Sequence, residues 1–260
     1  MKNTPLVIGL TFLIFFVSSC QQLQDAIPTQ TGITDTEIVA GLKEALNVGM
    51  DTTVKITSKL NGYLKDEAIK LLLPPEALSA ITKLKSTSIG NSLYEATMKS
   101  LESNMIESLN HAAEDAAIKA KPIFINAVTS MTIADGRNIL LGGVDTAATS
   151  YLRKTTYSQL QAAFSPEIDA SLNKKILLNK STNEYWKLFV DGHNLIANSP
   201  FNSPLGLSPI TSTSLGIYAT DKALKGLFIK VADEEKKIRK DPFKRVTDIL
   251  KKVFGELDKK

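Results

Sequence analysis

The chain has a single cysteine, Cys20, among 260 residues. One thiol cannot form a disulfide within the chain, and it cannot supply a cysteine-based metal site. The folded part must therefore be held together by its hydrophobic core. After residue 20, more than 200 residues remain, which is enough for one large core or two small ones.

Catalytic signatures are also scarce. The chain has two histidines, His111 and His193, and it has neither a G-x-S-x-G nucleophile elbow nor a Gly-rich phosphate-binding motif. The net charge of +4 is too small to indicate nucleic-acid binding. We therefore expect no nucleic-acid partner and no cofactor, and the sequence favours a non-enzymatic role.

The longest apolar run is short and lies at the start of the chain. It covers residues 6–17, follows Lys2, and is followed by Ser18 and Ser19 directly before Cys20. A helix that spans a bilayer needs about 20 apolar residues. The pattern resembles a bacterial lipoprotein signal with its lipobox. A cleaved secretory signal that happens to end near a cysteine is the alternative interpretation.

This resemblance predicts three segments: a signal peptide at residues 1–19, a lipidated Cys20 with a polar tether up to residue 33, and a folded domain at residues 34–260. Fatty acylation of Cys20 predicts a membrane-anchored protein of the bacterial cell envelope. Because Gln21 stands where an aspartate favours retention at the inner membrane, we expect the outer membrane, facing the periplasm.

The rest of the chain shows helical spacing of its apolar residues, and no segment alternates for long enough to predict a sheet. Start signals stand at Thr34, at Thr132 and at Ser181 or Thr182, and a further start is predicted at residues 165–167 around Pro166. Residues 197–216 form the one long irregular stretch. The fold class is therefore all-α, with a bundle-like domain of about ten helices of uneven length.

Several blocks of this domain resemble the bacterial domain-of-unknown-function family 4197. The resemblance implies a helical domain of bacterial envelopes and implies no reaction. The sequence departs from the family pattern at His111, at Ile118 and at residues 243–246. The matching blocks are residues 42–46 (LKEAL), 112–116 (AAEDA), 120–124 (AKPIF), 131–135 (MTIAD), 147–153 (AATSYLR), 220–228 (TDKALKGLF), 234–239 (EEKKIR) and 247–255 (TDILKKVFG).

Two polar groupings are candidate sites. Glu107, His111 and Asp115 follow one another at steps of four on a predicted helix, which fits a divalent metal or a solvated polar face. Asp191 and His193 fit part of a catalytic set, although no serine is singled out to complete it. We predict neither a metal site nor a catalytic residue.

Charged residues give two further hypotheses. Arg153 and Arg245 are single arginines in the matching blocks, and they either bind an anionic group or pin helix ends. Glu235 stands four residues before Arg239, which predicts a surface ion pair. Residues 225–260 hold 12 Lys or Arg against 7 Asp or Glu, which fits contact with anionic lipid or a solvated helical face.

Three functions follow in order of preference. The first is an interaction or scaffold module with a protein partner in the envelope. The second is a carrier or binding module for a lipid-like apolar ligand, because helices lined by Leu, Ile, Met and Ala are able to enclose a pocket. The third is a hydrolase acting on envelope material.

Overall fold

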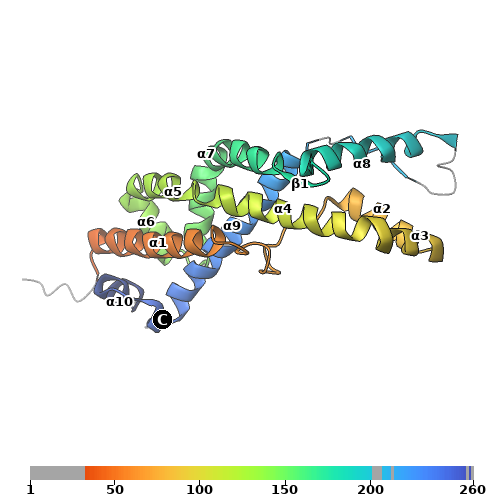
Figure 1. Cartoon of the computed structure of the whole chain (residues 1–260). Helices are drawn as coiled ribbons and strands as arrows, with labels where there is room; N and C mark the ends of the chain where they lie inside the picture. Colours follow the sequence, from red (N-terminus) through yellow and green to blue (C-terminus); the bar gives the residue numbers. More distant parts are fainter. Residues whose placement is uncertain (1–32, 201–206, 212–213, 256–257, 259–260) are drawn as a thin grey trace, which may run out of the picture. The chain divides into compact units, whose positions relative to one another are not determined.

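The computed structural model describes residues 33–200, 207–211, 214–255 and 258. Cys20 and the predicted signal and tether, except for its last residue, lie outside these residues. Residues 33–260 form one compact unit in which helices dominate. The prediction of an all-α, multi-helix domain is confirmed (Figure 1).

The α-helices differ widely in length, as expected. Their bounds are α1 Asp35–Thr57, α2 Pro75–Lys85, α3 Ser88–Leu93, α4 Lys99–Ala117, α5 Ala120–Thr129, α6 Ile133–Leu141, α7 Ala147–Leu172, α8 Thr182–Ala197, α9 Leu215–Lys240 and α10 Asp248–Gly255, with a π-helical turn η1 Tyr94–Met98 between α3 and α4 and a 3₁₀ turn η3 Pro242–Lys244 between α9 and α10.

The predicted start signals form real caps. The hydroxyls of Thr34, Thr132 and Ser181 each accept a hydrogen bond from the backbone N–H three residues on, and the acidic side chain at that position bonds back. Each cap satisfies N–H groups that have no partner inside the helix. Local sequence therefore sets the beginnings of α1, α6 and α8.

The core lies where the long helices meet. α7 packs against both α4 and α9, and α1 packs against α9, α10, α6 and α5. The buried face of α4 consists largely of alanines (Ala112, Ala113, Ala116 and Ala117), which allow neighbouring helices to approach closely. Larger side chains from α7 and α9, such as Phe164 and Leu227, fill the remaining space.

One predicted boundary is wrong. Residues 165–167 do not begin a new helix, because α7 runs unbroken through Pro166. A proline inside a helix costs about 3 kcal/mol. Phe164, Ile168 and Leu172 are completely buried around it, and each contributes about 1.5–3 kcal/mol. Burial along this face outweighs the cost of the proline.

A small hairpin was not predicted. Strands β1 Lys175–Leu177 and β2 Lys180–Ser181 pair in an antiparallel way between α7 and α8. Leu178 and Asn179 at its tip both have positive φ, which suits a tight two-residue turn. The pair is too short to show the alternation by which strands are recognised. No helix in the described part of the chain has the length and apolarity needed to span a bilayer.

Candidate functional site

An apolar groove runs between α2 and α8, with η1 and the start of α4 at its base; we call it the α2–α8 groove. It has two lobes that share Leu188 and Phe189. The first lobe has a volume of about 310 Å³ and the second about 500 Å³. The first is lined chiefly by Leu73, Ala77, Ile81, Met98, Leu101, Met105, Tyr185 and Trp186, and the second by Ala80, Lys83, Leu84, Thr87, Gly192, His193, Ile196 and Leu207.

Aromatic rings from α8 form one wall along both lobes. The rings of Trp186 and Phe189 stack with their centroids 5.4 Å apart, and the ring of His193 follows 5.7 Å from that of Phe189. The spacing of three and then four residues places all three on one face of α8. This row fixes the shape of the wall because stacked rings hold one another in place.

α2 supplies the opposite wall. Ala77, Ala80, Ile81 and Leu84 recur at helical steps of three and four and therefore share one face. Two of them are alanines, so the wall is set back from α8 and space remains between the helices. Pro75 opens α2 at a position where proline is tolerated, and Pro74 precedes it as the N-cap residue.

The base of the groove includes a local irregularity. The π-helical turn η1 interrupts the path from α3 to α4, and its last residue, Met98, lines the first lobe. Such turns occur often at functional sites. Met98 and Met105 bring flexible, polarisable side chains to a surface that can adapt to different apolar shapes.

Several polar groups at the groove already have partners, whereas the buried indole N–H of Trp186 has none among the described residues. Tyr94 donates a 2.7 Å hydrogen bond to Glu102, and this bond raises the pKa of Tyr94 to about 12. The hydroxyl of Tyr185 donates to the carbonyl of Leu177 at 2.9 Å. Because these groups are engaged within the protein, the groove offers its occupant mainly apolar contact.

The size and lining suit a small apolar molecule. Pockets that bind such ligands have volumes of about 300–1,000 Å³ and are mostly lined by hydrophobic and aromatic side chains. Leu188, shared by both lobes, leaves 54% of its surface exposed, and covering it would remove apolar area from water. The arrangement has the chemistry of binding.

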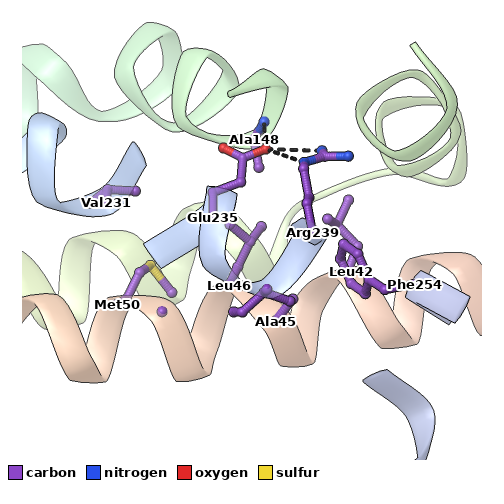
Figure 2. Close-up of a pocket in the computed structure, with 11 residues that line it drawn as sticks. Leu42, Ala45, Leu46, Met50, Ala148, Val231, Glu235, Arg239 and Phe254 are labelled. Carbon is purple, nitrogen blue, oxygen red and sulfur yellow. Dashed lines mark hydrogen bonds and ion pairs between the residues drawn. The ribbon is translucent and has the colours of Figure 1, made fainter. Parts of the chain in front are cut away.

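A second cavity lies deep between α1, α9 and α10 beneath Glu235 and Arg239 (Figure 2). Its volume is about 20 Å³, which is room for about one water molecule. Its walls consist mostly of apolar side chains such as Leu42, Leu46 and Phe254. It is too small for a ligand.

The Glu235–Arg239 pair above this cavity corrects the prediction of a surface ion pair. Both side chains are buried, and Figure 2 shows the carboxylate of Glu235 directed at the start of α7. It accepts hydrogen bonds from the backbone N–H groups of Ala148 and Thr149 at 2.9 and 2.8 Å. A carboxylate at a helix N-terminus is favoured by the helix dipole. Arg239 in turn donates to the carbonyl of Ile139.

A polar pocket of about 520 Å³ contains the predicted row of Glu107, His111 and Asp115. The carboxylate of Asp115 accepts hydrogen bonds from the hydroxyl of Ser171 and the ammonium group of Lys174, at the end of α7 and just after it. Within the described residues no group of three or more His, Cys, Asp or Glu side chains is placed to hold a metal ion. The pocket therefore brings the three predicted residues together.

Next to this row, Glu114 has a structural role that the sequence did not indicate. It is buried and accepts hydrogen bonds from the backbone N–H groups of Asn61, Tyr63 and Leu64 at 3.0–3.3 Å. Tyr63 then donates to the carbonyl of Ala223 on α9, and burial raises the pKa of its hydroxyl. Glu114 thus fixes the turn that follows α1.

The two candidate catalytic residues do not pair. Asp191 binds Lys187 on its own helix at 2.8 Å, and Nε2 of His193 lies 3.0 Å from the carbonyl oxygen of Ser208. His193 lines the second lobe of the groove, where its ring continues the aromatic wall. Neither contact assembles a nucleophile with a base.

The two single arginines lie apart from the groove. Arg153 is exposed, with its guanidinium 5.2 Å from the ring centre of Phe228. Arg245 is buried and donates to the carbonyls of Ile238 and Arg239, which places it at the end of α9. Of the two roles considered, Arg245 has the contacts of a residue that pins a helix end. Anion binding by either arginine stays a prediction.

The groove itself was missed as a site because its members looked like core residues. The helical spacing of Trp186, Phe189 and His193 was the available signal, and it indicates one face without saying what covers that face.

No curated protein and no solved structure matches the chain. A family model described as protein of unknown function, DUF4197, matches residues 32–255, and the chain therefore belongs to that family.

Proposed function

We propose that this protein is a lipid-anchored protein of the bacterial cell envelope whose helical domain binds an apolar ligand of the acyl-chain type in the α2–α8 groove. The anchor is Cys20, and the expected location is the outer membrane, facing the periplasm. The observation that carries the proposal is the two-lobed apolar groove between α2 and α8.

The form of the groove supports an acyl chain as its occupant. An acyl chain needs a continuous apolar wall and no hydrogen-bond partners along its length. Leu188 and Phe189 line both lobes, and the polar side chains Tyr185 and Glu102 are bonded within the protein. Each CH₂ group that leaves water contributes about 0.8 kcal/mol, so a long chain binds more tightly than a short one.

The proposed anchor supports the same ligand class. A lipidated Cys20 would hold the domain beside a leaflet, which is a source of acyl chains. Two or more chains on one cysteine give a lasting attachment, whereas a single chain holds only marginally. The sequence between residues 6 and 20 supports this attachment.

Binding can be tested with a pair of leucines on α8. Leu188 lines both lobes, whereas Leu195 is exposed on the same helix and lines neither. We expect the chain beginning at Gln21 to take up palmitate in native mass spectrometry. Leu188→Lys should weaken uptake at least about tenfold, because a charge in the groove opposes desolvation, and Leu195→Lys should leave it unchanged.

The outcome that overturns the binding proposal is equally specific. Absence of palmitate uptake by the unaltered chain, or equal uptake by the Leu188→Lys and Leu195→Lys variants, contradicts a ligand in the groove. The anchor has its own test: radiolabelled fatty acid should enter the protein in growing cells and should not enter a Cys20→Ser variant. An unlabelled protein found among cytosolic proteins contradicts the anchor.

A second function, an interaction module for a protein partner, is favoured by one observation. Leu195 of α8 leaves 76% of its surface exposed, beyond the residues that line the groove. A photo-crosslinking residue placed at 195 should capture a reproducible envelope protein in whole cells. If no partner is captured, this second candidate falls while the ligand proposal stands.

A further inference from the structure

A basic turn with an exposed aromatic ring lies between α9 and α10. Phe243 in η3 leaves 94% of its surface exposed, and Val246 leaves 65% exposed. Lys240 and Lys244 flank the ring in the sequence and are also exposed. We call residues 240–246 the basic turn. Exposed Phe beside lysines is a combination found in interfacial membrane-binding segments.

Hydrogen bonds and an ion pair hold the basic turn in place. Arg245 is 3% exposed, and it donates to the carbonyls of Ile238 and Arg239 and pairs with Asp258. The side chain of Asp241 accepts a 2.9 Å hydrogen bond from the backbone N–H of Phe243. These contacts fix the backbone of the turn, so the exposure of Phe243 is imposed by the fold.

The charge around the turn is of one predominant sign. Exposed lysines stand at positions 236, 237, 240, 244, 251 and 252. Among the described residues, Lys236 and Lys244 have no ion-pair partner, whereas the other four are paired with acidic side chains. Each lysine near an anionic leaflet strengthens binding about fivefold.

The helix that follows the turn, α10, lies beside the beginning of α1. Lys252 of α10 pairs with Glu37 in the first turn of α1 at 2.5 Å, and Val253 packs against Gly41. Figure 1 shows α10 beside the beginning of α1. Residues 21–33 can span at most about 45 Å, so an anchor at Cys20 would keep this end near the leaflet without orienting it.

We propose that the basic turn docks on an anionic lipid leaflet, with Phe243 and Val246 entering the interface and the surrounding lysines contacting the head groups. This inference rests on the proposed anchor at Cys20 for its proximity to the membrane. The anchor supplies attachment and the basic turn supplies orientation. A domain docked in this way presents a fixed face to the membrane.

Tryptophan probes in the full lipidated protein test the proposal. In a Trp186→Phe background, Phe243→Trp places the only indole in the turn, and Ile217→Trp places it at the opposite end of α9, where Ile217 is also exposed. The vesicles contain phosphatidylcholine with phosphatidylglycerol and carry brominated acyl chains. We expect quenching and a blue shift for Trp at 243 and neither effect at 217.

Charge is tested with a matched pair of lysines. Lys244→Gln, added to the Phe243→Trp protein, should lower the docking equilibrium constant about fivefold. Lys225→Gln, on the exposed surface of α9, should leave it unchanged. Vesicles of phosphatidylcholine alone should reduce quenching in every variant that carries Phe243→Trp, because the attraction to anionic head groups is lost.

The outcomes separate this proposal from the anchor. Intact mass shows whether Cys20 carries lipid. A lipidated protein whose Trp at 243 is no better quenched than Trp at 217 overturns docking and leaves the anchor intact. An unlipidated protein that still shows quenching at 243 on added anionic vesicles overturns the anchor and supports docking.

Discussion

The interior around α7 and α9 and the α2–α8 groove use the same kinds of apolar side chains with opposite results. Around α7, residues such as Phe164 and Ile168 are completely buried, and the buried carboxylate of Glu235 has every partner it needs. Along the groove, Leu188 is exposed although Trp186 beside it is buried. The first region is filled by the protein itself, and the second leaves room for something else.

The difference comes from the helix faces that meet. α7 meets α4 and α9, which bring interlocking small and large residues. α2 meets α8 with alanines at Ala77 and Ala80, so neither wall reaches the other. A region that is left unfilled by its own chain either remains hydrated or is covered by a ligand.

The largest expected effect is in the filled region. Glu235→Ala leaves Arg239 buried without its partner and removes the acceptor for the first N–H groups of α7. We expect the free energy of unfolding to fall by about 3–5 kcal/mol. Urea unfolding followed by circular dichroism measures it. The control Glu234→Gln, which affects an ion pair with the half-exposed Lys237, should change it by at most about 1 kcal/mol.

The next largest effect is expected at Gly41. A Cβ on Gly41 would lie 2.5 Å from Cγ2 of Val253, where α1 and α10 are in contact. Gly41→Ala should therefore lower the free energy of unfolding by about 1–3 kcal/mol. Measured stability equal to or above that of the unaltered chain would contradict the close packing of α10 on α1.

Gly192→Ala, in the groove, is expected to change the free energy of unfolding in the opposite direction. A Cβ there meets nothing within 4 Å, and the residue lies inside α8. Gly192→Ala should raise the free energy of unfolding by about 1 kcal/mol, because alanine is the better helix former. Thermal unfolding measures this gain. A loss of stability would mean that the second lobe is already closed.

The smallest effect concerns the pKa of Tyr94 beside the groove. Its hydrogen bond to Glu102 raises that pKa from 10.0 to about 12. Between pH 10 and 12 the folded chain keeps a proton that the unfolded chain loses, so this contribution to stability falls as the pH rises through that window. Glu102→Gln should return the pKa toward 10.0 in a tyrosine carbon NMR titration. An unchanged titration would show that the bond is absent in solution.

Much of the fold was predictable because it is encoded locally. Thr34, Thr132 and Ser181 mark helix beginnings with neighbours three residues away, and the structure confirms each. Pro166 led to a wrong helix boundary. The burial of its neighbours, which outweighs the cost of a proline inside α7, depends on contacts with other helices. The prediction for Glu235 was wrong for the same reason: its partner Ala148 lies 87 residues away in the sequence.

The site was harder to predict than the fold. Ala77 on α2 and Trp186 on α8 are separated by more than 100 residues, and helical spacing does not tell which faces meet. A filled core and an open groove have the same periodicity of apolar residues. The sequence therefore supported either core packing or an apolar pocket, and the structure provides the groove.

Methyl NMR tests the central claim, that the α2–α8 groove is the place where an apolar ligand binds. On addition of palmitate, the isoleucine methyl signals of Ile81 and Ile196, one in each lobe, should move together and saturate. Those of Ile38 and Ile168, buried in the filled interior, should stay in place. Signals of Ile81 and Ile196 that do not move, or shifts at Ile168 as large as theirs, would contradict ligand binding in the α2–α8 groove.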